Sequence, residues 1–266
     1  MKYSTILLFS GFIVFSACNE KAEKSKWLPD VTNKDHGPLK QKEFGGDFDE
    51  IEVSQAIEAE IIKSDVEKVV ISAPANIIDE ILVERNGGKL HIHYKTGFRV
   101  MNTNNVSAKI YAKDFVKLIA NSAASITIKD KFTQEKTDVE ASSSASISGD
   151  LEANDLDISM DSSSSFNGKI WAVNLDVDAS SAASISISGK SKNADMSSSS
   201  GSSINGKDVI VENLKADSSS GASLEVSASS TVDAEASSGG SLNVYKKGNV
   251  TTVKKEESSG GSVTIQ

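Results

Sequence analysis

Eight copies of a short serine motif occupy the chain from residue 121 to its end. In each copy Ser-x-x-Ser is followed by an apolar residue, and only Ala, Gly or Ser stands at the x positions. A period kept over so many copies predicts a solenoid in which each repeat forms one coil. A disordered Ser-rich segment would give the apolar residues no reason to keep register. These apolar anchors lie 18 to 21 residues apart, at Ile126, Ile147, Phe166, Ile185, Ile204, Leu224, Leu242 and Val263.

The residues around each anchor alternate between apolar and polar, which is the pattern of a β-strand with one buried face. The sequence LDVDA at residues 175–179 is one example. The coils are too short for a leucine-rich repeat with helices, and no calcium-binding nonapeptide repeat is present. We therefore predict an all-β fold, a right-handed parallel β-helix of about eight Ser-rich coils in which equivalent residues stack at about 4.8 Å.

The serine directly before each anchor is expected to form a ladder along the solenoid. Stacked hydroxyls can hydrogen-bond to one another and to nearby backbone groups. A catalytic serine needs a base within reach, and no histidine occurs after residue 121. We therefore interpret this ladder as structural. It consists of Ser125, Ser146, Ser165, Ser184, Ser203, Ser223, Ser241 and Ser262.

Residues 44–120 lack the serine motif but still alternate as strands do. The sequence NGG at residues 86–88 predicts a tight turn, and residues 75–81 are compatible with a short helix. We interpret residues 44–120 as an N-terminal cap with irregular first coils, and residues 121–266 as the repeats. A cap is needed because each coil buries its apolar face only against its neighbours.

The amino terminus resembles an export signal. Lys2 precedes an apolar run from Ile6 to Phe15, and small residues follow it, which predicts a signal peptide over residues 1–17. The run is shorter than the roughly 20 apolar residues of a membrane-spanning helix. FSAC at residues 15–18 resembles the lipobox of bacterial lipoproteins, so we expect a lipid on Cys18. An ordinary signal peptide with an incidental cysteine is the alternative. Residues 18–43 are expected to form a flexible tether.

The charge balance argues against a nucleic-acid partner. The chain has 28 basic and 37 acidic residues, and both arginines precede the repeats. Binding to a phosphate backbone needs clustered Lys and Arg. We expect the membrane as one partner, reached through the lipid, and a surface glycan or protein as a second partner whose identity stays open.

Two pairs of residues outside the ladders are candidates for binding. His91 and His93 are two apart on an expected strand, so both face one side and could share a metal ion with a third ligand. No acidic or cysteine partner stands at a recognisable spacing. This favours the interpretation that both histidines are exposed strand residues without a metal. Trp171 and Tyr245 could serve as platforms for a sugar ring, whereas Phe166 is an anchor and is expected in the core.

A column of carboxylates stands nine residues before the anchors of four successive coils. At a spacing of about 4.8 Å, these side chains would repel one another. One interpretation is a solvated acidic face, relieved by Lys215 in the next coil. The other is a ladder bridged by calcium as a cofactor, because calcium prefers several carboxylate oxygens. The column consists of Asp138, Asp157, Asp176 and Asp195.

Three segments carry a resemblance to a known family. SINGK at residues 203–207, SFNGK at residues 165–169 and ILVERNGGKLHIHY at residues 81–94 resemble the GIN-domain family of auto-transporter adhesin heads, common in exported proteins of Bacteroidetes-type bacteria. The resemblance extends over roughly residues 44–266. It implies a β-helical protein of the cell envelope. Together with the lipid expected on Cys18, this leads us to expect a lipoprotein at the outer membrane.

The resemblance leaves two classes of function open. We expect a non-enzymatic adhesion or structural module. The alternative is a glycan-binding or glycan-active protein, similar to a polysaccharide lyase. A groove in which carboxylates, Lys and Trp171 converge would favour the alternative, and uniform ladders would favour the first.

Overall fold

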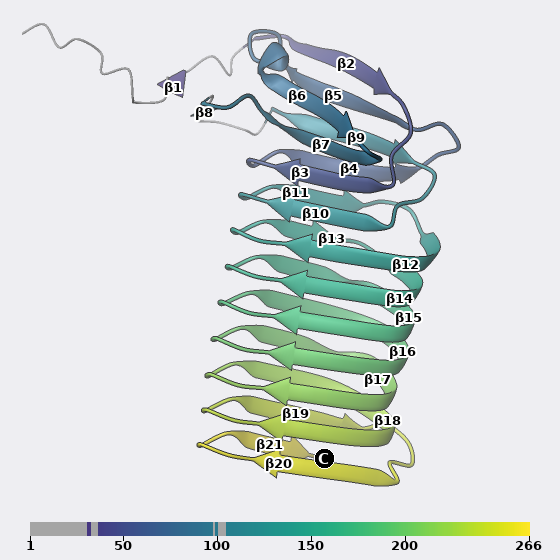
Figure 1. Ribbon diagram of the computed structural model, residues 1–266, viewed down its shortest axis with the longest axis vertical. Helices are drawn as coiled ribbons and strands as arrows, with labels where there is room; N and C mark the ends of the chain where they lie inside the picture. The colour runs from purple at the N-terminus through teal and green to yellow at the C-terminus, as the bar shows by residue number, and fades with distance from the viewer. Residues whose placement is uncertain (1–30, 33–36, 98, 101–104) are drawn as a thin grey trace, which may run out of the picture.

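The structure is a computed structural model that describes residues 31–32, 37–97, 99–100 and 105–266. The predicted signal peptide and Cys18 lie outside these residues. The fold is all-β apart from one 3-10 turn, η1 (Ile78–Glu80), within the segment where a short helix was expected. In the described ranges, no helix has the length and apolar character needed to cross a membrane. The chain winds into coils stacked along one long axis (Figure 1).

The serine repeats form the regular part of the stack. Their strands are parallel and in register, so that Phe166 pairs with Ile185 and Ile185 with Ile204. All eight anchors are at most 3% exposed, which confirms the β-solenoid and its inward face. From β15 to β18, a single strand of 14 to 16 residues runs through most of each coil. The strands are β10 (Lys117–Asn121), β11 (Ser125–Ile128), β12 (Phe132–Ala141), β13 (Ser146–Ser148), β14 (Leu151–Met160), β15 (Ser165–Ala179), β16 (Ser184–Ser198), β17 (Ser203–Ser218), β18 (Ser223–Ala236), β19 (Ser241–Lys246), β20 (Thr252–Glu257) and β21 (Ser262–Ile265).

The first serine of each motif is where the chain turns. These eight serines have φ between 47° and 55°, and the residues after them have φ between 62° and 80°. Two successive residues with positive φ define a type I′ turn, which disfavours bulky side chains. The turns also bond between coils, because the Ser144 amide donates to the Ser162 carbonyl at 3.0 Å. At the next position a side chain on Gly240 would place its Cβ 2.2 Å from the carbonyl oxygen of Ser218. Left-handed backbone and close packing together explain the small residues of the motif.

The first regular coil precedes the serine repeats. Strands β3 (Glu50–Ser54) and β4 (Glu58–Lys63) stack in register on β10 and β11. Gln55 and Ala56 make the same turn, with φ of 61° and 58°. This coil keeps the backbone of the repeat without its serines, which is why it was placed in the irregular cap from the sequence.

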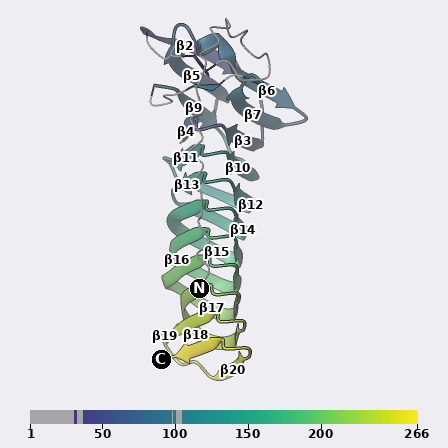
Figure 2. The same ribbon diagram turned by 90° about the vertical axis from the view of Figure 1, so that its left-hand side faces the viewer.

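The remaining strands close the amino-terminal end of the stack and spread wider than the coils (Figure 2). Strands β7 (Lys89–Tyr94) and β9 (Ser107–Ala112) run parallel to β3 and β4, and β2 (Leu39–Gly45), β5 (Lys68–Pro74) and β6 (Ile81–Asn86) pair antiparallel with their neighbours. Gly87 and Gly88 form the predicted tight turn with positive φ. Strand β1 (Val31–Thr32) pairs with β8 (Arg99–Val100). Both β1 and the start of β2 fall within the predicted tether, so the paired part of the chain begins before residue 44.

The last coil closes the core with charged side chains. Lys255 and Glu257 of β20 occupy the inward positions held by Ala234 and Ala236 in the coil before. Lys255 Nζ lies 3.1 Å from Glu257 Oε1, and the same carboxylate accepts a hydrogen bond from the Val263 amide at 2.7 Å. Inward-pointing charges on an edge strand oppose pairing with another chain.

Candidate functional site

The structure brings the four aspartates of the predicted ladder together on one face. Each pairs in register with the next, and Lys215 follows in the coil after them. Lysines contact the two ends of the ladder: Lys136 Nζ lies 3.1 Å from Asp138 Oδ1, and Lys215 Nζ lies 2.7 Å from Asp195 Oδ2. In the described part of the chain, no ion pair involves Asp157 or Asp176.

The two central aspartates resist ionisation. Burial is the largest cause that raises the pKa of Asp157, followed by the charges of Asp176 and Asp138. Burial also raises the pKa of Asp176, with Asp178 and Asp195 adding to it. These shifts have the sign expected of stacked like charges. They are compatible with both interpretations of the ladder, and the bridging calcium stays a prediction.

A second ladder, which was not predicted, runs beside the aspartates. It consists mainly of amides, and each member donates a hydrogen bond to the one in the coil before: Asn174 to Asp155 at 2.7 Å, Asn193 to Asn174 at 2.9 Å, Asn213 to Asn193 at 3.0 Å and Thr231 to Asn213 at 3.0 Å. A groove of about 400 Å³ lies between the two ladders. The same period marks these residues in the sequence, since they stand eleven residues before the anchors.

Another part of the coils presents Trp171 to solvent. The strand alternation directs Ile170 into the core, where it is 2% exposed, and leaves the Trp171 side chain 46% exposed. Glu152 and Lys190 are its partners in the adjacent coils. Two grooves of about 510 Å³ and 430 Å³ adjoin the indole, and both are lined by Trp171 and Lys190. Trp171 is thus a rigidly held aromatic residue at the junction of two grooves.

Lysines and carboxylates converge on these grooves. Glu152 forms an ion pair with Lys131 at 2.5 Å. In the described ranges, no ion pair involves the other three lysines that line these grooves, Lys169, Lys190 and Lys192. The convergence of carboxylates, Lys and Trp171 is the feature expected of the alternative, a glycan-binding or glycan-active protein. It occurs on the same molecule as the uniform ladders expected of an adhesion or structural module. The two grooves have no lining residue in common with the groove between the ladders. The charged lining residues are Lys131, Asp150, Glu152, Lys169, Lys190, Lys192 and Glu212.

The serine ladder directly before the anchors is also in register along the stack. Ser146 Oγ donates to Ser125 Oγ at 3.1 Å, and Ser223 Oγ donates to Ser203 Oγ at 3.2 Å. These contacts link neighbouring coils, which agrees with the structural interpretation.

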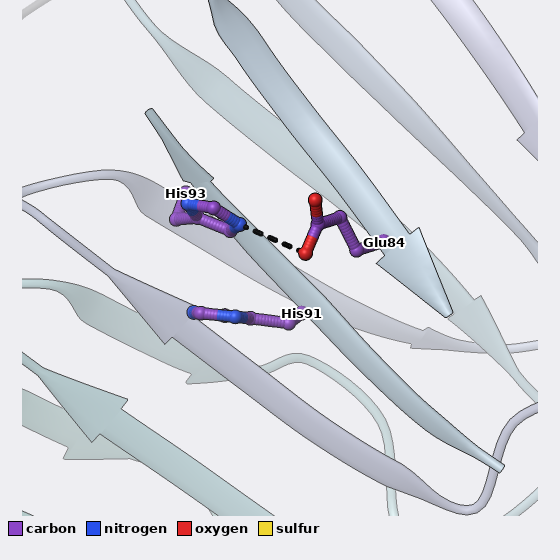
Figure 3. Close-up of side chains that lie close together, drawn as sticks. All are labelled: Glu84, His91 and His93. Carbon is purple, nitrogen blue, oxygen red and sulfur yellow. Dashed lines mark ion pairs between the residues drawn. The ribbon is translucent and has the colours of Figure 1, made fainter. Parts of the chain in front are cut away.

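The cap holds a cluster of two histidines and a glutamate. His91 and His93 share the outward face of β7, and their ring centroids are 4.1 Å apart (Figure 3). Their side chains are only 30% and 17% exposed, so they are not the freely exposed residues that were favoured from the sequence. The hairpin places Glu84 of β6 opposite His91, and Glu84 Oε2 lies 3.4 Å from His93 Nε2.

Hydrogen bonds orient both rings. His93 Nδ1 donates to the backbone carbonyl of Tyr94 at 2.8 Å, and Nε2 faces the carboxylate across the hairpin. His91 Nε2 lies 3.1 Å from Ser54 Oγ and 3.7 Å from Glu52 Oε1. Burial, the largest cause, lowers the pKa of His91 against the opposing effect of Glu52. Glu84 could have been located from the sequence, because the two-residue turn at Gly87 and Gly88 fixes the hairpin register that pairs it with His91. Glu52 comes from a neighbouring parallel strand, which no local spacing reveals.

Comparisons with known proteins identify the fold and the family. No curated protein matches the chain. A structure described as "a putative adhesin" from Parabacteroides merdae ATCC 43184 has a TM-score of 0.78 at 17% identity, over 86% of this chain and 97% of its own. A "putative lipid binding protein" from Parabacteroides distasonis ATCC 8503 has a TM-score of 0.78 at 20% identity, over 86% and 97%. A "putative adhesin" from the same organism has a TM-score of 0.77 at 19% identity, over 87% and 98%.

The likeness to these solved structures establishes the fold alone. The family assignment rests on a family model that matches residues 47–169 and 151–248, which together include most of the cap and most of the coils. That family is described as "putative auto-transporter adhesin, head GIN domain". This chain belongs to the GIN-domain family.

Proposed function

We propose that this chain is a non-catalytic binding module of the cell envelope, anchored in the outer membrane by a lipid on Cys18. The export-type amino terminus, the family description and the adhesin names of the structural neighbours support this assignment. A stack of coils presents side chains at a fixed repeat along a rigid surface. Such a surface suits contact with an extended partner better than enclosure of a small substrate.

The exposed indole of Trp171 between two grooves is the observation that points to the partner. An aromatic ring held on a β-strand offers a flat apolar face, and Trp is enriched at interfaces because it combines this face with a polar N–H. The apolar face of a sugar ring can stack on such a surface. We therefore assign the binding of a glycan to the face around Trp171.

The charged residues around the indole specify the glycan further. Lys169, Lys190 and Lys192 have no ion pair in the described part of the chain, and they lie on a protein with a formal charge of −9. Lysine ammonium groups form strong charge-assisted hydrogen bonds with carboxylate, sulfate or phosphate groups. The preferred ligand is a glycan that carries such acidic groups.

The column that contains Trp171 can extend the contact to the next two coils. It continues with Lys190 and with Ile210, whose side chain is 40% exposed. In the following coil the register shifts and Ser227 is buried, so the exposed part of the column ends there. Tyr245 lies beyond this break, and Lys207 Nζ lies 4.5 Å from the centroid of its ring. At about 4.8 Å per coil, a ligand could follow the exposed part for about 10 Å.

Glycan-array binding tests this proposal on a version of the chain that begins at Asn19. This version retains every described residue and the whole core, which extends from Phe48 to Val263. We expect acidic glycans to bind, Trp171→Ala to abolish binding, and Lys190→Ala to weaken it. Asp176→Asn, on the face of the ladders, is the matched control and should bind as the wild type does.

Three results would contradict the proposal. The wild type could bind no glycan, or Trp171→Ala could bind normally while its circular dichroism spectrum is unchanged. Cleavage of the bound glycan, detected as new chain ends, would refute the non-catalytic assignment.

A further inference from the structure

We propose that Glu84, His91 and His93 bind one divalent transition-metal ion, best matched by zinc, on the outward face of the hairpin β6–β7. This site is independent of the glycan-binding surface. The carboxylate comes from β6 and both imidazoles come from β7, and the three side chains lie together in Figure 3.

The spacing of the ligand atoms suits a single ion. One candidate ligand atom from each side chain lies within 4.8 Å of the other two. In a tetrahedral zinc site with bonds of about 2.0 to 2.2 Å, ligand atoms are about 3.4 Å apart. His93 Nε2 and Glu84 Oε2 are already 3.4 Å apart. The Glu84 side chain is 62% exposed, so it can adjust toward the ion.

The hydrogen bonds of the rings select one nitrogen of each histidine for the metal. In His93 the Nδ1–H donates to the Tyr94 carbonyl, which leaves Nε2 to bind the ion. In His91 the contacts with Ser54 and Glu52 are made by Nε2, which leaves Nδ1. Metal-binding histidines usually donate their other ring N–H to a carbonyl or carboxylate in this way. The rings are stacked at an interplanar angle of 24°. Because each lone pair lies in its ring plane, one ring must rotate about its Cβ–Cγ bond for both lone pairs to converge on one ion.

A buried nitrogen supplies a second observation. His93 Nε2 is buried and has no hydrogen-bond partner, although it faces a carboxylate. Unsatisfied buried polar atoms are uncommon and call for an explanation. A metal cation between His93 Nε2 and Glu84 Oε2, which lie 3.4 Å apart, would give the buried nitrogen a partner.

The donor atoms define the class of metal. Two imidazole nitrogens and one carboxylate oxygen suit zinc and its neighbours in the first transition series, whereas calcium and magnesium prefer oxygen ligands alone. The three protein ligands leave a fourth tetrahedral position for water or for a group of a partner. A bound ion would also cross-link the hairpin at the capped end of the stack.

The experiment titrates the version that begins at Asn19, stripped of metal with a chelator, with zinc in a calorimeter. We expect one equivalent to bind and the melting temperature to rise with zinc concentration. His91→Ala and His93→Ala should each weaken binding by more than about tenfold, and Glu84→Gln should also weaken it. The remaining histidine of the chain, His36, provides the matched control, and His36→Ala should bind zinc as the wild type does.

Cobalt provides a structural readout. Cobalt bound at this site should give visible ligand-field bands, which His93→Gln should lose while its circular dichroism spectrum stays native. The proposal is overturned if no equivalent of zinc binds, if His36→Ala weakens binding as much as His93→Ala does, or if the folded His91 and His93 variants bind like the wild type. If His36→Ala and His93→Ala weaken binding equally, zinc is held only by adventitious contacts.

Discussion

Replacing Ile185 by alanine should destabilise the solenoid by about 3 to 4 kcal/mol. The side chain is 1% exposed and stacks in register between Phe166 and Ile204. Alanine removes three carbons, which contribute about 2.4 kcal/mol at roughly 0.8 kcal/mol each. The cavity left in a core that cannot collapse fully accounts for the remainder. Ile185→Asp should cost more, because it also buries a carboxylate that lacks a partner.

The matched control is Asp178→Asn, on the exposed face of the preceding coil. Its effect should stay within about 0.5 kcal/mol. It should be slightly stabilising at neutral pH, because the charge of Asp178 raises the pKa values of Asp157 and Asp176. Urea denaturation, monitored by circular dichroism, measures both variants. The slopes of the unfolding free energy against urea concentration must also be compared, because a repeat fold can lose coils separately. Equal midpoints for Ile185→Ala and Asp178→Asn would refute the assignment of inward and outward faces.

Three further predictions concern the anchor and the acidic ladder. Cys18→Ser should release the protein from membranes, and a variant that still fractionates with membranes after a high-salt wash would contradict lipid attachment. The pKa values of Asp157 and Asp176 are raised in the folded state, so their ionisation costs stability above those pKa values and the cost disappears as the pH falls through them. The double variant Asp157→Asn/Asp176→Asn should therefore exceed the wild type in melting temperature most at about pH 7, and least near pH 4. If calcium bridges the ladder, millimolar calcium should raise the melting temperature of the wild type relative to chelator and to magnesium, but not that of the double variant. An equal shift in both proteins would leave only a solvated acidic face.

The sequence predicts the coils well because a stacked fold converts spacing into position. Once the anchors are aligned, a residue at a given offset from one anchor lies beside the residue at the same offset in the next coil, as Phe166 lies beside Ile185. The aspartate ladder could be located in this way. The same reasoning would have found the amide ladder at Asn174. It fails at the first coil, where Gln55 and Ala56 keep the turn without the serines.

The histidine cluster could be predicted only in part. Period-two alternation places His91 and His93 on one face. Glu84 reaches them through the antiparallel register of a hairpin, and Glu52 through a parallel strand some 40 residues earlier in the sequence. The hairpin pairing follows from the two-residue turn at Gly87 and Gly88, but the parallel pairing leaves no signal, because the cap is built from single strands that do not repeat. Contacts between coils are thus predictable by offset, whereas contacts within the cap depend on tertiary pairing.

The two ends of the stack are closed by different means, which leaves the flanks for the binding that we propose. Antiparallel strands cover one end, and at the other end the inward pair of Lys255 and Glu257 interrupts the apolar core. A continuing stack would require apolar side chains at these positions, so end-to-end addition of another solenoid is disfavoured. The flanks carry their groups at a constant interval, so a partner with repeated chemical groups can contact several coils at once. Each contact can be weak, because linked contacts multiply affinity without new chemistry at any single one.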